Sequence, residues 1–227
     1  MKKTGIISAM WVEAKLLAEA MDNVKIIEYN GMKFYDGLLC GHSVILSTCG
    51  VGKLNAAIYT QLMIDRFNIG RLIHTGIAGS LDSSAGHLDV VIANCLTYHD
   101  VRKSQMIDLF PYQEYFKTDE NLHGLLLQCA EEKGNSKVHD GMILTGDAFV
   151  TSRDQKEKLK KRFPQALCVD MESCAVAHTA YVNQIPTGIL RCISDLADGD
   201  AHGDYAAFEQ KVADKAAEIV IKAVCKV

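Results

Sequence analysis

Short apolar runs alternate with amphipathic stretches along the whole chain, and the two patterns predict strands and helices in turn. Two early turns, Asn30-Gly31 and Cys40-Gly41, join apolar runs in a manner typical of β-hairpins. The apolar runs predict strands at Lys3–Ala9, Lys25–Tyr29, Lys33–Leu39, His42–Thr48, Arg71–Thr75, Leu88–Ala93, Lys137–Leu144, Ala166–Val169 and Thr187–Ile193. The amphipathic stretches predict helices at Trp11–Ala20, Lys53–Phe67, Glu120–Glu132, Ser152–Phe163, Glu172–Asn183 and Tyr205–Val224.

This alternation predicts an α/β fold with a mixed central sheet that helices cover on both faces. No internal repeat or change of composition marks a boundary, so we expect residues 1–227 to form a single domain. Residues 101–119 show no clear period and carry several aromatic side chains. We therefore expect a long loop there, and loops of this length are usually functional or mobile.

The composition narrows the classes of partner. The net charge is −4, so no basic surface indicates a nucleic-acid or anionic-membrane partner. The longest apolar runs fall short of the ~18 residues that a membrane-spanning helix needs. The chain has eight cysteines and no C-x-x-C pair, which is typical of buried, reduced thiols in a cytoplasmic protein. The histidines show no ligand spacing either, so we expect neither a disulfide framework nor a metal site.

Polar or glycine-rich residues follow several predicted strands, and active groups of α/β sheets gather at strand ends. These segments are Ala9–Glu13, Thr75–Gly79, Gly146–Val150, Val169–Glu172 and Ile193–Asp198. Taken singly each is weak, because glycine turns and surface carboxylates are common. Asp195 and Glu172, however, each follow an apolar run, where desolvation would raise the pKa of a carboxyl group and keep a proton available near neutral pH. One protonated acid and one ionised base are what cleavage of a glycosidic bond requires.

Short motifs follow one another in a fixed order over almost the whole chain. They are Gly5–Met10 with Glu13, Gly50–Lys53, Thr75–Gly79, Tyr98–Asp100, Gly146–Phe149, Phe163–Ala166, Asp170–Glu172 and Arg191–Asp195. In this order the sequence resembles the methylthioadenosine/S-adenosylhomocysteine nucleosidases, within the wider nucleoside phosphorylase family. The resemblance implies a nucleoside phosphorylase-like, three-layer αβα sandwich whose mixed central sheet is partly barrel-like. It also implies a homodimer without a cofactor that hydrolyses the N-glycosidic bond of a small nucleoside substrate, methylthioadenosine or S-adenosylhomocysteine, and releases adenine.

The resemblance assigns the chemistry to three carboxylates. Asp195 would be the general acid that protonates N7 of adenine, with Ser194 holding its side chain in position. General acid catalysis of this kind contributes ~10²–10⁴-fold. Glu13 would orient and deprotonate the attacking water. Glu172 would hydrogen-bond the ribose hydroxyls and stabilise an oxocarbenium-like transition state.

The resemblance also assigns substrate contacts. Phe149 would stack on adenine, the backbone of Val150 would read the purine edge, and Met171 would pack under the ribose. Gly79 and Ala78 would let the backbone approach the purine and the water closely. The positions matching the surroundings of the ribose and its 5′ substituent are Met10, Val51, Tyr205 and Phe208. From the residues alone, the apolar members of this set are more typical of core packing.

Two alternative functions remain, a purine nucleoside phosphorylase and a nucleoside-binding relative without turnover. Phosphate needs cationic or helix-terminal donors. The hexameric phosphorylases carry an arginine just before the glycine-rich turn, where this chain has His74, and an acidic Glu13 near the first strand suits water rather than phosphate. Retention of all three carboxylates argues against a binding protein. Ile77 replaces a serine found in many nucleosidases, and residues 101–116 depart from the family pattern, which leaves the 5′ group open between methylthio, homocysteinyl, deoxy and futalosine-like groups.

Overall fold

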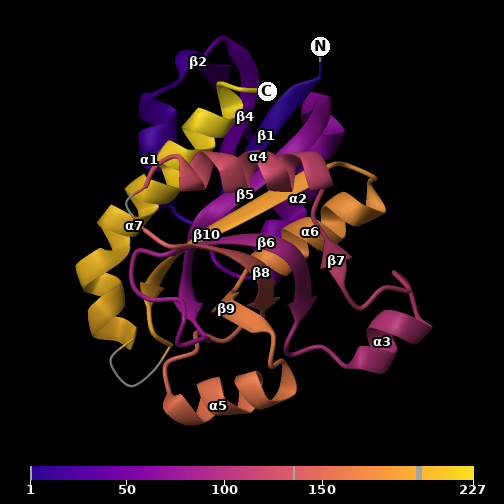
Figure 1. Ribbon diagram of the computed structural model, residues 1–227. Coiled ribbons are helices and arrows are strands. Elements are labelled where there is room, and N and C mark those ends of the chain that lie inside the picture. Colours follow the sequence, from indigo (N-terminus) through magenta and orange to yellow (C-terminus); the bar gives the residue numbers. More distant parts are fainter. Residues whose placement is uncertain (1, 135, 198–200) are drawn as a thin grey trace.

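The computed structural model describes residues 2–134, 136–197 and 201–227, and for residues 201–207 only the helical course of the backbone. It has a central sheet between two groups of helices (Figure 1). The strands are β1 (Lys3–Ser8), β2 (Asp22–Tyr29), β3 (Met32–Leu39), β4 (His42–Thr48), β5 (Ile69–Ser80), β6 (Val90–Tyr98), β7 (Phe116–Lys117), β8 (Val138–Thr145), β9 (Ala166–Asp170) and β10 (Thr187–Asp195). The helices are α1 (Trp11–Glu19), α2 (Lys53–Phe67), α3 (Lys103–Asp108), α4 (Glu120–Glu131), α5 (Arg153–Arg162), α6 (Ser173–Val182) and α7 (Ala201–Val224).

The sheet is mixed and partly closed on itself. Its strand order is β10-β6-β8-β9-β5-β1-β4-β3-β2, and β10 also pairs with β5, so β5, β9, β8, β6 and β10 form a closed ring. The pairs β1–β4, β1–β5, β5–β10, β6–β8 and β8–β9 are parallel. The hairpins β2–β3 and β3–β4 are antiparallel and continue the sheet beyond the ring.

Both faces of the sheet are buried under helices. Ile6 and Ile7 are neighbours on β1, so their side chains point to opposite faces, and both are fully buried. Ile6 joins the core under α1, α4 and α7, whereas Ile7 joins the core under α2 and α6. This burial on both faces makes a three-layer αβα sandwich, as the strand and helix pattern predicts.

Two segments differ from the sequence-based expectation. The glycine-rich stretch after Thr75 is not a turn, because β5 continues to Ser80 and is held on both sides, by β10 and by β9 at Gly79. Residues 101–119 are not a structureless loop. They contain the short helix α3 and the strand β7, which pairs with β6 through the hydrogen-bonding register Cys95 to Lys117.

The cysteines also depart from expectation at one pair. Cys40 and Cys225 form a disulfide bond with a Cα–Cα distance of 5.2 Å, so the prediction that all cysteines are reduced was wrong for this pair. Cys40 lies in the β3–β4 turn and Cys225 just after α7, and packing of α7 on the sheet brings together residues 185 positions apart. The other cysteines of the described chain are free thiols. No helix within the described ranges is long and apolar enough to cross a membrane.

Candidate active site

A cavity of about 450 Å³ opens where β1, β5, β9 and β10 end. The parallel strands β1, β5 and β10 bring their carboxyl ends to one edge, and β9 pairs with the end of β5 in antiparallel orientation, so residues far apart in the sequence meet there. The lining residues are Ala9, Met10, Glu13, Val51, Ile77, Ala78, Gly79, Phe149, Val169, Asp170, Met171, Glu172, Ser194 and Asp195. All three carboxylates singled out from the sequence are in this set, and each is at least nine-tenths buried.

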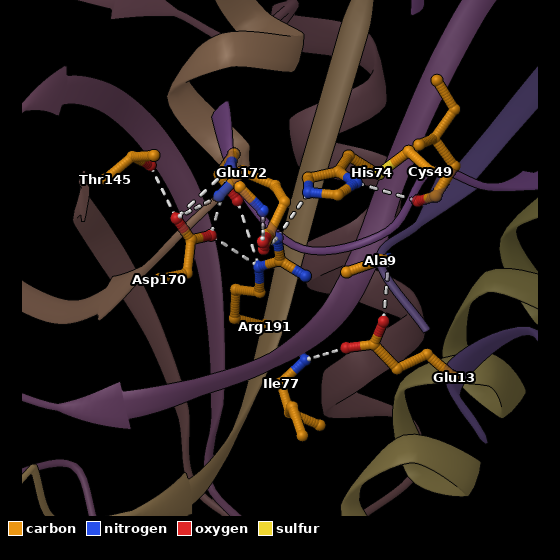
Figure 2. Close-up of polar contacts among 12 residues, drawn as sticks. Ala9, Glu13, Cys49, His74, Ile77, Thr145, Asp170, Glu172 and Arg191 are labelled. Carbon is orange, nitrogen blue, oxygen red and sulfur yellow. Dashed lines mark hydrogen bonds and ion pairs between the residues drawn. The ribbon is translucent and has the colours of Figure 1, made fainter. Parts of the chain in front are cut away.

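Glu13 is fixed by the start of its own helix. It is the third residue of α1, so its side chain turns back to the helix N-terminus, where Oε2 accepts hydrogen bonds from the backbone N–H groups of Ala9 and Met10, both at 2.8 Å. Its Oε1 accepts from the N–H of Ile77 on β5 at 3.0 Å (Figure 2). Burial raises the pKa of Glu13, although Arg191 and these three N–H groups oppose the shift.

Glu172 lies at the joint between β9 and α6. Its Oε1 accepts a hydrogen bond from the backbone N–H of Gly52 at 2.8 Å, and its Oε2 lies 3.5 Å from an Nη2 of Arg191. Burial raises the pKa of Glu172 to about 7, with Arg191 opposing the shift and Asp170 adding to it. The Glu172 carboxyl group is therefore near the midpoint of its titration at neutral pH. In its ionised form it is a strong hydrogen-bond acceptor.

Asp195 is the last residue of β10. The hydroxyl of Ser194 donates to its Oδ2 at 2.9 Å, and the backbone N–H of Ala197 donates to its Oδ1 at 2.9 Å. Gly79 on the neighbouring β5 leaves the space that this carboxylate occupies. Two donors and one close backbone contact thus fix the position of the Asp195 side chain at the cavity wall.

A buried arginine connects several polar side chains of the site. Arg191 is fully buried, and its Nε donates to Asp170 Oδ2 at 2.7 Å and to Ser173 Oγ at 3.1 Å. Its Nη2 contacts Nε2 of His74 (Figure 2). The Nδ1 of His74 lies 2.8 Å from the carbonyl oxygen of Ile7. A carbonyl only accepts, so Nδ1 carries the proton and Nε2 accepts from Arg191. Burial and the arginine charge lower the pKa of His74 to about 3, so this imidazole is neutral.

The same cluster is the candidate cation site of the described residues. One ligand atom each from His74, Asp170 and Glu172 lie within 4.8 Å of one another. The guanidinium of Arg191 already bonds His74 and Asp170 and pairs with Glu172. A positive charge from the protein therefore occupies the place that a metal ion would take.

The other predicted contact residues divide into four groups. Met10, Val51, Ala78, Gly79, Phe149, Met171 and Ser194 line the cavity. Val150 is buried behind Phe149 and lines a smaller adjoining pocket of about 20 Å³. Phe208 is outside the lining set and stacks on His87 with ring centroids 4.7 Å apart, so the structure does not bring it to the cavity. The side chain of Tyr205 lies outside the described residues.

The sequence analysis assigned no role to several residues that the structure places in the site. Ala9 and Ile77 act through backbone N–H groups that hold Glu13, and backbone donors leave no residue-type signal. Asp170 belongs to a recognised motif, yet only the structure shows that it anchors Arg191 through an ion pair. Thr145 supports Asp170 through a hydroxyl hydrogen bond of 2.6 Å.

The sequence matches the phosphorylase superfamily over residues 3–226. The chain therefore belongs to this superfamily. A 5′-methylthioadenosine/S-adenosylhomocysteine nucleosidase from Staphylococcus saprophyticus is 37% identical over 223 residues, which cover 95% of this chain and 96% of the relative. Within the superfamily, the chain is thus a member of the 5′-methylthioadenosine/S-adenosylhomocysteine nucleosidase family.

Solved structures agree with this assignment. The 5′-methylthioadenosine/S-adenosylhomocysteine nucleosidase of Neisseria meningitidis, in complex with methylthio-immucillin-A, superposes with a TM-score of 0.96 at 32% identity and full coverage of both chains. The futalosine hydrolase of Helicobacter pylori superposes with a TM-score of 0.92 at 29% identity, covering 100% of this chain and 98% of that one. The predicted nucleoside phosphorylase-like fold with a partly barrel-like sheet is confirmed.

Proposed function

We propose that the protein hydrolyses the N-glycosidic bond of 5′-methylthioadenosine and S-adenosylhomocysteine and releases adenine. The observation that carries the proposal is the convergence of Glu13, Glu172 and Asp195 on one cavity of about 450 Å³. Family membership and the neighbouring structure solved with methylthio-immucillin-A support the same substrate class. No step of the proposed reaction needs a cofactor.

In the proposed reaction, Asp195 acts on the leaving group and Glu13 on the nucleophile. Asp195 donates its proton to N7 of adenine as the C1′–N9 bond breaks, so adenine leaves as a neutral base. Water attacks C1′ while Glu13 accepts one of its protons, and the sugar gains a hydroxyl group at C1′. The raised pKa of Glu13 supports its role as a base, because a base with a higher pKa takes a proton more readily.

Glu172 and the apolar lining bind the rest of the substrate. Glu172 accepts hydrogen bonds from the ribose hydroxyls, and its negative charge stabilises the positive charge that develops on the sugar ring. Phe149 lines the cavity and is 37% exposed, which supports its proposed stacking on the purine, and the Val150 backbone next to it reads the purine edge. Met171 packs under the ribose, and Met10 and Val51 surround its 5′ side.

The charge of the cavity favours water over phosphate as the nucleophile. Among the described residues that line it there are four acidic side chains, Glu13, Asp170, Glu172 and Asp195, and no Lys or Arg. His74 offers no cation in place of the phosphorylase arginine, because it is buried, neutral and absent from the lining set. A phosphate dianion would therefore find no cationic side chain facing it in this cavity, and ionised carboxylates there would repel it.

An adenine-release assay tests the proposal. Purified protein in phosphate-free buffer should release adenine from 5′-methylthioadenosine and S-adenosylhomocysteine, with 5′-deoxyadenosine, adenosine and inosine as comparison substrates. Failure to turn over either thio-nucleoside, with tight binding retained, would instead support the nucleoside-binding alternative. The ratio of kcat/KM values across the panel measures the preference for the 5′ group.

We also propose that the chain is a single domain and works as a homodimer. One continuous sheet through the chain supports the first statement. Leu54 and Ile58 are 73% and 46% exposed and lie four residues apart on one face of α2. Val51, just before this helix, is 47% exposed and lines the cavity, and the three apolar side chains support a protein interface there. Light scattering should give a dimer mass for the wild type and a monomer for Leu54→Glu, whereas Ile26→Glu on β2 should leave the dimer unchanged.

We further propose a cytoplasmic location. Free thiols at Cys49, Cys129, Cys168, Cys174 and Cys192, all buried, support it because proteins of oxidising compartments tend to pair their cysteines. The Cys40–Cys225 bond is the exception. Fractionation of expressing cells should recover the protein with cytoplasmic markers, and recovery in a secreted or periplasmic fraction would contradict the proposal.

A further inference from the structure

Three charged side chains that have no role in the proposed chemistry connect segments next to the cavity. The ammonium group of Lys53, the first residue of α2, donates to both carboxylate oxygens of Asp100 at 2.7 Å and lies 3.3 Å from Asp147 Oδ2. The backbone N–H of Asp147 donates to Asp100 Oδ2 at 2.9 Å. We call Lys53, Asp100 and Asp147 the Lys53 bridge. It connects the start of α2, the end of β6 and the loop after β8.

The bridge is partly shielded from solvent. The side chains of Lys53 and Asp100 are 19% and 31% exposed, whereas that of Asp147 is 57% exposed. The ammonium group also lies 5.5 Å from the ring centroid of Tyr98, where a cation–π contact adds to the ion pairs. Shared hydrogen bonds and reduced solvation make such a network stronger than an isolated surface pair.

Two consecutive backbone N–H groups at the start of α2 connect the bridge to the site. The N–H of Gly52 holds Oε1 of Glu172 at 2.8 Å, and the N–H of Lys53 holds Oδ1 of Asp147 at 3.1 Å. Asp147 lies two residues before Phe149 in the loop that forms the cavity wall. Glu172, the proposed ribose-binding carboxylate, and Asp147, in the loop that carries Phe149, are therefore hydrogen-bonded to adjacent peptide units.

We propose that Lys53 is a positioning residue that fixes the purine loop, residues 146–150, relative to Glu172. Its side chain binds Asp100, which holds the backbone of Asp147, and its backbone holds the side chain of Asp147. Loss of the ammonium group releases two of the three connections and leaves only the backbone N–H of Lys53 on Asp147, which weakens the coupling between Phe149 and Glu172. The kinetic part of this proposal rests on the proposed function, whereas the mechanical coupling does not.

The chain provides a matched control at another Lys–Asp pair. Lys3 donates to both oxygens of Asp36 at 2.7 Å, and both side chains are 26% exposed. Lys3 lies at the start of β1, whereas the cavity lies beyond the end of that strand. Lys3→Met therefore removes a pair of the same geometry and similar exposure without touching the site.

Hydrogen exchange and kinetics on Lys53→Met and Lys3→Met test the proposal. In Lys53→Met, amides of residues 50–53 and 146–150 should exchange at least about threefold faster, while in Lys3→Met they should keep the wild-type rates. KM for 5′-methylthioadenosine should rise about three- to tenfold, with a smaller change in kcat, and Lys53→Arg should restore most of the loss.

Asp100→Asn serves as a second variant if Lys53→Met does not fold, and should give the same exchange pattern. Wild-type exchange rates in both segments of a folded Lys53→Met or Asp100→Asn protein would overturn the coupling. Faster exchange with an unchanged KM would overturn the kinetic part. A wild type that turns over no nucleoside would refute the proposed function, and the exchange data would still decide the coupling.

Discussion

Gly79 on β5 lies directly against the carboxylate of Asp195 at the end of β10. A methyl group at Gly79 would lie 2.8 Å from Asp195 Oδ1 and 3.2 Å from the side chain of Ala197. These distances are shorter than normal van der Waals contact, so an alanine would displace the carboxylate. The position of the proposed acid therefore depends on the neighbouring strand having glycine, which has no side chain, at position 79.

Gly79→Ala should lower kcat about 10²-fold, because general acid catalysis is lost when the acid is misplaced by even ~1 Å. Gly124→Ala is the matched control, since nothing lies within 4 Å of that position and it is in the middle of α4. Alanine there should stabilise the protein by ~0.5–1 kcal/mol with unchanged kinetics. Unchanged kcat in Gly79→Ala would remove Asp195 from the reaction as described.

Arg191→Met should be among the most destabilising single substitutions in the chain. It leaves Asp170 and Glu172 buried without their cation, and breaking a buried pair costs about 3–5 kcal/mol. Lys160→Met is the comparison, because the Lys160–Asp82 pair is partly exposed and should contribute no more than ~1 kcal/mol. Urea unfolding of the three proteins measures both values, and equal losses would show that the burial of Arg191 has no special weight.

The apparent pKa of the acid limb of the pH–rate profile should lie well above the ordinary pKa range of a glutamate. Burial raises the pKa of Glu13 and that of Glu172, the latter to about 7 from 4.5. Both groups work as carboxylates, so falling pH protonates them and activity is lost. Because the two share Arg191, the limb belongs to the pair rather than to either residue.

A profile of kcat/KM from about pH 5 to about pH 9 measures this limb. We expect the rate to rise with pH through the region near neutrality. A rate that is already at its plateau at about pH 5.5 would mean that the carboxylates titrate like exposed glutamates.

Inorganic phosphate should neither be consumed nor accelerate the reaction. The described lining residues include no cation that could hold a dianion next to C1′. Product analysis in the presence and absence of phosphate should give the free thio-sugar in both cases, at equal rates. A sugar 1-phosphate would identify a phosphorylase and would require a phosphate-binding group that the cavity does not show.

Much of the fold follows from the sequence because burial leaves a regular pattern. The helix from Lys53 to Phe67 was predicted with its observed bounds, and the four N-terminal strands were placed to within a few residues. The extent of β5 was not, since a run of glycines is typical of a turn, and only pairing with β9 and β10 keeps Gly76–Gly79 extended. The Cys40–Cys225 pair depends on how α7 packs, which local patterns do not encode.

The site, like the fold, was predicted only in part from the sequence. Asp195 and Glu172 were found because each follows an apolar run, and Glu13 because its motif resembles the family. The backbone donors at Ala9, Gly52 and Ile77 were not found, because any residue type can provide an N–H group. Phe208 was placed near the ribose by its matching position, but its described ring stacks on His87 instead.

Adenine release by Asp195→Asn is the most direct measurement of the central claim that three buried carboxylates break the glycosidic bond with water. The amide keeps the shape of the side chain and cannot donate an acidic proton. We predict a loss of about 10²–10⁴-fold in kcat for 5′-methylthioadenosine with a thermal midpoint and circular dichroism close to those of the wild type. Near-normal turnover by a folded Asp195→Asn protein would contradict the account.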